Sequence, residues 1–328
     1  MDTRPEARSI PAGGGGARGL GGGAAKRPTV GCGPAARMRK GGRLAVTPEA
    51  EVVGLDPSGG ARTRLEAVLQ GIPSAMVAVS GGVDSAVVLA VAAQVVPRVV
   101  AASGTSVAYA AEDLAAARAL AARLGVEHVE VPTRETTDPR YAVNAPSRCF
   151  HCKSELYGKL LVEAAQRGLA VLLDGAHAGD LGDFRPGMRA ADALGVRSPL
   201  REAGLFKTDV RSIARSLGLP IWDKPASPCL ASRFPYGEMI TAEKLSMVER
   251  AEAHLHELGW REVRVRHHGN LARIEVPPAE LPRLLEQADG IAAFLRRLGY
   301  LYVAVDLQGF RSGSLNATLS PQERAAAR

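Results

Sequence analysis

Ser80-Gly81-Gly82-Val83-Asp84-Ser85 is the stretch around which the chain is organised. The apolar run 75–79 before it is typical of a buried strand, and the apolar run 86–93 after it is typical of a buried helix that ends before Pro97. The two glycines permit a tight turn between strand and helix, and the free N–H groups at the helix start favour an anion. The sequence therefore predicts a phosphate-binding loop, with a ligand-free glycine turn as the simpler alternative.

This loop resembles the PP-loop, SGGxDS, of the ATP pyrophosphatases. It is not a Walker A loop, because no lysine follows the glycines. The resemblance implies cleavage of ATP to AMP and pyrophosphate, so that an acceptor oxygen becomes an adenylate that can be displaced. It also implies that Asp84 acts near Mg²⁺ and the phosphates, whereas the simpler interpretation of Asp84 is a helix N-cap. The residues expected to bind ATP are Ser80, Gly81, Gly82, Asp84 and Ser85.

Charge and cysteine usage limit the possible partners and location. The chain of 328 residues has a net charge of +7, but residues 1–47 hold nine Lys or Arg against two acidic residues. The rest of the chain has 32 basic and 32 acidic residues, which argues against a nucleic-acid partner. The sequence contains no run of about 18 apolar residues, so no membrane span is predicted. Four cysteines in a chain of this length do not indicate a disulfide scaffold, so we expect a reducing cytoplasm.

Composition and periodicity divide the chain into three parts. Residues 1–47 are rich in Gly, Ala and Arg and are predicted to be a disordered tail that contains Cys32, or translation upstream of Met38 as an alternative start. Residues 48–237 alternate strands with helices, which predicts an α/β fold with a doubly wound parallel sheet. The expected strands are 75–79, 98–102, 128–131 and 170–173, and the expected helices are 63–70, 86–93, 112–124, 153–166 and 207–217. Ligands of such sheets bind beyond the carboxyl ends of the strands, so we expect the loop at 80–85, the segments 103–110 and 174–187 and the cysteine segment to surround one crevice there.

Residues 238–328 predict a smaller C-terminal α+β domain. Its expected elements are a helix at 241–258, strands at 262–267, 271–276 and 300–307, and helical material at 279–298. The alternation Val263/Arg264/Val265/Arg266 places valines on one face of a strand and arginines on the other. A solvated strand face is the common reason for alternating arginines.

Three cysteines are candidates for chemistry. Cys149-Phe150-His151-Cys152 precedes a predicted helix, and Cys229 lies in the proline-rich loop 222–233, which should return to the same crevice. The pair alone is compatible with a redox pair, with half of a zinc site or with an iron–sulfur site, and a zinc site with all three cysteines could take His177 as its fourth ligand. Unconnected buried thiols are the remaining interpretation. Three cysteines would leave one iron of a [4Fe–4S] cluster without a protein thiolate.

Taken together, five motifs resemble the LarE family of ATP-dependent sulfur transferases. These are the loop at 80–85, RCFHCK at 148–153, DFRPG at 183–187, CLASRFPYG at 229–237 and FRSG at 310–313. The resemblance covers about residues 60–320 and implies a PP-loop, HUP-like fold and a homo-hexamer. It implies sulfur insertion into pyridinium-3,5-biscarboxylic acid mononucleotide, whose carboxylates become thiocarboxylates in the synthesis of the nickel-pincer nucleotide cofactor of lactate racemase.

The family contains two kinds of enzyme, which differ in the sulfur source. Some members sacrifice one cysteine of the loop before SRFPYG and end with dehydroalanine. Others hold a [4Fe–4S] cluster with three cysteines and pass on a sulfide bound at the open iron. This chain has the three-cysteine arrangement, so the resemblance implies that Cys149, Cys152 and Cys229 are cluster ligands. Family positions that bind the substrate's phosphate match Ser232, Arg233, Arg264 and Arg266.

Other functions share parts of this pattern. A tRNA thiolase also joins a PP-loop to cysteines, but the folded part has no excess of positive charge to hold RNA. An NAD or GMP synthetase-like amide-forming ligase shares the loop but does not need the cysteines. A non-enzymatic iron–sulfur or nucleotide-binding module belongs to a different class again.

Overall fold

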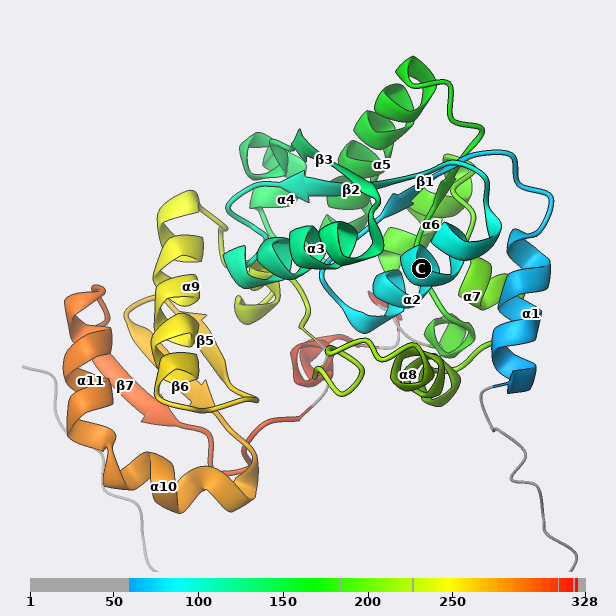
Figure 1. Ribbon diagram of the computed structural model, residues 1–328. Helices are drawn as coiled ribbons and strands as arrows, with labels where there is room; N and C mark the ends of the chain where they lie inside the picture. Colours follow the sequence, from blue (N-terminus) through cyan, green and yellow to red (C-terminus); the bar gives the residue numbers. More distant parts are fainter. Residues whose placement is uncertain (1–58, 183–184, 226, 312, 321, 324–328) are drawn as a thin grey trace, which may run out of the picture. The chain divides into compact units, whose positions relative to one another are not determined.

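The computed structural model describes residues 59–182, 185–225, 227–311, 313–320 and 322–323 (Figure 1). All of these belong to one compact unit that spans residues 53–328. The predicted tail and Cys32 lie outside the described residues, as do Asp183, Phe184 and Ser312 of the family motifs. The boundary predicted between residues 237 and 238 stays a prediction.

A parallel four-stranded sheet confirms the predicted fold class (Figure 1). The strand order is β3-β2-β1-β4, and β1 pairs with both β2 and β4. The order reverses next to β1, since the first three strands run to one side and β4 lies on the other. The strand bounds are β1 Ala75–Ala78, β2 Val99–Thr105, β3 Glu127–Pro132 and β4 Val171–Leu173.

Helices cover both faces of this sheet. Successive side chains of β1 point to opposite faces, so Val77 joins one apolar cluster and Met76 joins another. The first cluster contains residues from α1 Gly59–Leu69, α2 Val83–Val95, α3 Ala111–Leu124, α7 Pro199–Glu202 and α8 Lys207–Ser216. The second contains residues from α5 Arg148–Gln166 and α6 Pro186–Ala193.

Two features differ from the sequence-based expectation. Helix α5 begins at Arg148 rather than at Lys153, because Ser147 ends the preceding turn and the N–H of Arg148 already bonds to Ala145. The short helices α4 (Pro139–Ala142), α6 and α7 were not predicted. Each begins at a proline, which is favourable at the first position of a helix even though it breaks a helix interior.

The C-terminal region forms a small mixed sheet, as the predicted α+β pattern indicated. Strand β5 (Arg264–His268) pairs antiparallel with β6 (Leu271–Glu275), which pairs parallel with β7 (Tyr302–Val305). Helices α9 (Ala242–Glu257), α10 (Leu281–Glu286) and α11 (Ala288–Arg297) accompany the sheet, and α9 and α11 pack against its apolar side. Five 3₁₀ turns complete the described elements: η1 Glu135–Thr137, η2 Ala178–Gly182, η3 Leu230–Arg233, η4 Pro278–Glu280 and η5 Ser314–Thr318. None of the described helices is long and apolar enough to cross a membrane.

Candidate functional site

The predicted phosphate loop connects β1 to α2 in a conformation that requires glycine. Gly81 has φ +74°, and a Cβ added there would lie 2.1 Å from the carbonyl oxygen of Asp113. Gly82 is the residue before α2 and has no side chain to occupy the first N–H groups of the helix. The hydroxyl of Ser85 closes the loop, because it accepts from the N–H of Ser80 at 3.1 Å and donates to the carbonyl of Gly82 at 3.2 Å. The loop therefore presents backbone donors in a fixed arrangement.

The loop stands where the strand order reverses, the usual ligand position in an open parallel sheet. Gly175 follows β4, and a Cβ added there would come within 2.7 Å of the backbone nitrogen of Ser85. The loop after β4 thus lies directly against the start of α2, as predicted for segment 174–187. Before it, the buried Asp174 accepts hydrogen bonds from the Tyr157 hydroxyl at 3.0 Å and from the N–H of Ala176 at 3.1 Å.

Two lysines that the sequence analysis missed converge on this loop. Lys207, at the start of α8, places its ammonium 2.6 and 2.7 Å from the two carboxylate oxygens of Asp84. Lys224 donates to the carbonyl of Gly81 at 3.2 Å and to Asp113 at 2.7 Å. The helix N-cap is Gly82, so the simpler interpretation of Asp84 as the N-cap is wrong. The sequence signal for these lysines was weak, because neither belongs to a recognised motif. Only Lys224 lies in a loop that was expected near this site.

The structure gathers the three candidate cysteines. Cys149 and Cys152 lie in the first turn of α5, where a spacing of three places side chains on one side of a helix. Cys229 directly precedes η3 and packs with Cys152 in one apolar cluster. Tyr109 belongs to the same cluster, and its hydroxyl lies 3.6 Å from the sulfur of Cys152. All three thiols are free.

The pKa values of the thiols depend on burial and on the charges around them. Burial raises the pKa of Cys149, the Arg148 guanidinium lowers it, and Cys229 raises it again. Burial likewise raises the pKa of Cys152 to about 12, with Lys153 lowering it and Cys229 raising it. Within the described residues no three His, Cys, Asp or Glu side chains are close enough to hold a single metal ion, and His177 pairs with Asp180 instead.

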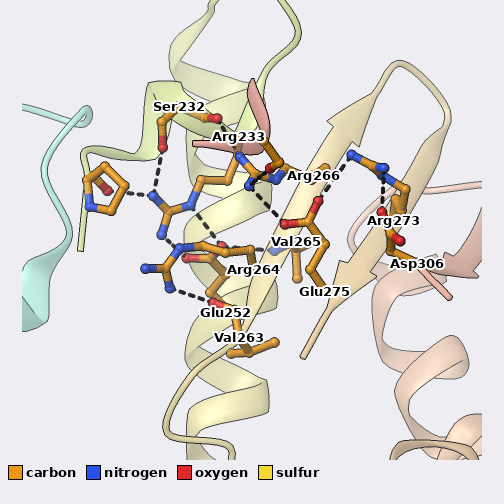
Figure 2. A network of polar contacts seen from close by, with 12 residues as sticks. Ser232, Arg233, Glu252, Val263, Arg264, Val265, Arg266, Arg273, Glu275 and Asp306 are labelled. Carbon is orange, nitrogen blue, oxygen red and sulfur yellow. Dashed lines mark hydrogen bonds and ion pairs between the residues drawn. The ribbon is translucent and has the colours of Figure 1, made fainter. Parts of the chain in front are cut away.

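The arginines on β5 are buried in a polar network (Figure 2). Arg264 is 5% exposed and Arg266 8% exposed, so the alternative of a solvated strand face is wrong. Arg266 pairs with the buried Glu275 at 2.8 Å and donates to the backbone carbonyl of Ser232 at 2.8 Å and to the Ser314 hydroxyl at 2.9 Å. It therefore joins β5 to the loop that follows Cys229.

A second pair fixes the same loop from α9. Arg233 forms a bidentate pair with Glu252, with N···O distances of 2.9 and 2.7 Å, and donates to the Ser232 hydroxyl at 3.0 Å. Glu252 also accepts from the N–H of Val265 at 2.9 Å. Burial and then the charges of Arg233 and Arg266 together lower the pKa of Arg264 to about 10, although Glu252 opposes them. The arginines thus repel one another, and an anion beside them would relieve that repulsion.

One loop touches all of these parts. Lys224 contacts the phosphate loop, and the hydroxyl of Ser227 lies 3.4 Å from Asp113. Cys229 follows, and Arg233 at the end of the loop binds Glu252. The structure therefore brings together the residues that the sequence analysis selected in 80–85, 149–152 and 229–233 through a segment predicted only as a proline-rich loop.

Comparison with known proteins identifies the relationship. A family model described as asparagine synthase matches residues 71–183. The pyridinium-3,5-bisthiocarboxylic acid mononucleotide synthase of Lactiplantibacillus plantarum is 40% identical over 266 residues, covering 80% of this chain and 96% of that protein. An uncharacterized protein of Synechocystis is 45% identical over 249 residues, covering 75% of this chain and 93% of that protein. The chain therefore belongs to the LarE family of ATP-using enzymes, within the PP-loop superfamily.

Proposed function

We propose that this protein inserts sulfur into pyridinium-3,5-biscarboxylic acid mononucleotide after adenylating a substrate carboxylate with ATP. A carboxylate oxygen leaves poorly, so its conversion to an acyl-adenylate, a mixed anhydride with AMP, allows sulfide to attack the acyl carbon and AMP to leave. The products are the thiocarboxylic mononucleotide, AMP and pyrophosphate. The named relative from Lactiplantibacillus plantarum supports this substrate.

The phosphate loop and its lysines support ATP binding. The backbone of Gly81 to Ser85 would hold the departing pyrophosphate, since preorganised N–H groups stabilise charge that develops there. Mg²⁺ would spread the phosphate charge, and the carboxylate of Asp84 fits it because hard oxygen donors suit this ion. Lys207 now neutralises Asp84 and would turn to the phosphates when the nucleotide arrives. Lys224 would fix the loop through the Gly81 carbonyl.

The arginine network supports binding of the mononucleotide's phosphate. The expected phosphate-binding residues lie together where η3 meets β5 (Figure 2): Ser232, Arg233, Arg264 and Arg266. Guanidinium groups suit phosphate oxygens, and the pKa of Arg264 is lowered by burial first and then by the charges of Arg233 and Arg266, so a phosphate there would stabilise its charged form. Most donors of Arg233 already bind Glu252 and nearby backbone carbonyls, so its share of the phosphate contact would be the smallest.

The cysteines support a [4Fe–4S] cluster as the sulfur source. Three free thiols of neighbouring segments fit such a cluster, because thiolates are its ordinary ligands. The cluster would supply sulfide from the iron that no cysteine holds. Burial raises the pKa of Cys149 and Cys152, and the charges of Arg148 and Lys153 oppose that rise and so assist the thiolate forms. The hydroxyl of Tyr109 would hydrogen-bond to the Cys152 sulfur.

The loop from Lys224 to Arg233 is the observation that carries this proposal. It places Cys229 between a contact to the phosphate loop and a contact to the arginine network. An amide-forming ligase does not need thiols beside the phosphate loop. A tRNA thiolase does not need a buried cluster of arginines such as that on β5 and η3. We also propose, from the family resemblance and the cysteine usage, a homo-hexamer in the cytoplasm.

Pyrophosphate release and the fate of the cysteines test the proposal. Anaerobically purified protein should release pyrophosphate with the mononucleotide and not with tRNA or ammonia, and should contain iron and sulfide. Replacing Cys149, Cys152 or Cys229 by Ala should remove cluster and sulfur transfer together, whereas Cys32→Ala is the matched control. Activity of the Cys149→Ala and Cys152→Ala variants, with dehydroalanine at residue 229, would instead establish a sacrificial cysteine.

A further inference from the structure

Two segments far apart in sequence carry the three cysteines, and a buried asparagine joins them. The side-chain amide of Asn144 donates to the carbonyl oxygen of Pro235 at 2.7 Å, after the loop that carries Cys229. Its carbonyl oxygen accepts from the guanidinium of Arg148, the first residue of α5. Asn144 is 0% exposed, so water does not compete for these hydrogen bonds.

The backbone around Asn144 strengthens the connection. Its own carbonyl accepts from the N–H of Gly237 at 3.1 Å, and the neighbouring carbonyl of Ala142 accepts from Ile240 at 2.9 Å. Arg148 is 3% exposed and lies over the ring of Tyr236, 5.6 Å from its centroid. The start of α5 and the segment after Cys229 are therefore attached by side-chain, backbone and ring contacts at one place.

Asn144 adopts a backbone conformation that glycine would adopt more easily. Its φ is +54°, and it is the one non-glycine residue with positive φ in the part of the chain that the structure describes. Asparagine tolerates this conformation better than most residues, but glycine has no Cβ to strain it. An asparagine here is explained by its amide, which glycine lacks. Strained residues of this kind concentrate at functional sites.

We propose that Asn144 is a positioning residue that holds the Cys229 loop in register with the first turn of α5. The three thiols then lie near one another in the metal-free protein, before any iron is bound. The consequence for cluster assembly rests on the function proposed above, but the register itself concerns only this chain's residues. Arg233 supports the other end of the loop by donating to the carbonyls of Pro228 and Cys229 and by binding Glu252.

Cross-linking of Cys152 to Cys229 measures this register directly. The full chain carrying Cys32→Ala and Cys149→Ser keeps only these two thiols and can be treated with dibromobimane, which fluoresces only after both arms react. Asn144→Gly keeps the backbone conformation and removes the amide, so we expect cross-linking at least fivefold slower. Asn270→Gly, in the exposed turn between β5 and β6, is the matched control and should cross-link at the parental rate.

A purely structural role is separated from positioning by temperature and by a second variant. Asn144→Gly lowers the melting temperature in either case, so the rate is measured well below the transition and ATP binding is checked to be unchanged. If that variant does not fold, Asn144→Asp keeps the shape and puts an oxygen against the Pro235 carbonyl, and should also slow cross-linking. Parental rates in the folded variants, or no cross-link in the parent, overturn the inference.

Iron content distinguishes failure of this inference from failure of the proposed function. In one outcome the parent cross-links normally, Asn144→Gly does not, and the wild-type protein takes up no iron under anaerobic reconstitution. That outcome refutes the proposed cluster and leaves the positioning role of Asn144 intact. Asn144 variants that cross-link normally and also bind iron normally refute the positioning role and leave the cluster intact.

Discussion

Arg264 and Arg266 lie on one strand, yet the structure predicts that their removal destabilises the protein by different amounts. Arg266→Ala would leave Glu275, which is 1% exposed, without the guanidinium that lies 2.8 Å away. Removing one partner of a buried pair costs about 3–5 kcal/mol. Arg273 remains 3.1 Å from the other carboxylate oxygen, so we expect the lower end, about 3 kcal/mol.

Arg264 stands in a different electrostatic position. Burial and then the repelling charges of Arg233 and Arg266 together lower its pKa to about 10. Arg264→Met keeps an apolar stem near the ring of Phe310, whose centroid is 5.2 Å from the guanidinium carbon, and removes the repulsion. We therefore expect a loss of about 1 kcal/mol or less in the free energy of unfolding.

Urea denaturation of the full chain compares the two variants, and titration calorimetry compares their ligands. Both should bind the mononucleotide more weakly, by about 1.5–3 kcal/mol as for a lost charge-assisted hydrogen bond, with ATP affinity unchanged. Arg266→Met combined with Glu275→Gln should recover much of the stability lost by Arg266→Ala, because no buried charge then stands unpaired. An Arg266→Ala protein within about 0.5 kcal/mol of wild type would refute the reasoning about this pair.

Four further predictions follow from other parts of the molecule. Asp84→Ala should abolish substrate-dependent pyrophosphate release without unfolding the protein, and normal turnover would remove Asp84 from the mechanism. Gly81→Ala should abolish ATP binding because its Cβ would meet a carbonyl oxygen at 2.1 Å, whereas Gly71→Ala, with φ +83° and open space, should only lower the melting temperature. Deleting residues 1–47, which carry the whole net charge, should preserve activity and melting temperature, and a large fall in either would show a structural tail. Burial lowers the pKa of His267 from 6.5 to about 4, so the unfolded chain takes up a proton first and stability should decline as pH falls through that window. The urea midpoint of His267→Gln should change less with pH between these values.

The sheet could be predicted because its strands are short apolar runs separated by helices with clear glycine ends. The start of α5 could not, since nothing in the letters of RCFHCK distinguishes a helical first turn from a loop. A proline disrupts the interior of a helix but is favourable at its first position. The short helices that begin at prolines 139, 186 and 199 were therefore not predicted from the sequence.

The candidate site was predictable only where a motif is local. The loop at 80–85 and the cysteine pair are each contiguous; the loop connects β1 to α2 as expected, whereas the pair lies within α5 and not before it. Lys207 is 123 residues from its partner Asp84, and Lys224 is 143 residues from Gly81, so no spacing rule connects them. The alternation of β5 predicted which side its arginines face. It did not predict their burial, because that depends on Glu252 and Glu275 from other elements.

A single carboxylate on α9 has a consequence for remodelling this enzyme. Glu252 pairs with Arg233 on the loop that carries Cys229, and it accepts a hydrogen bond from the N–H of Val265 on the strand that carries Arg264 and Arg266. A change in the position of one of these two segments therefore also shifts the other. Changes in β5 selected to admit a longer or differently charged mononucleotide would also displace the cysteine loop, and successful variants should accumulate compensating changes along α9.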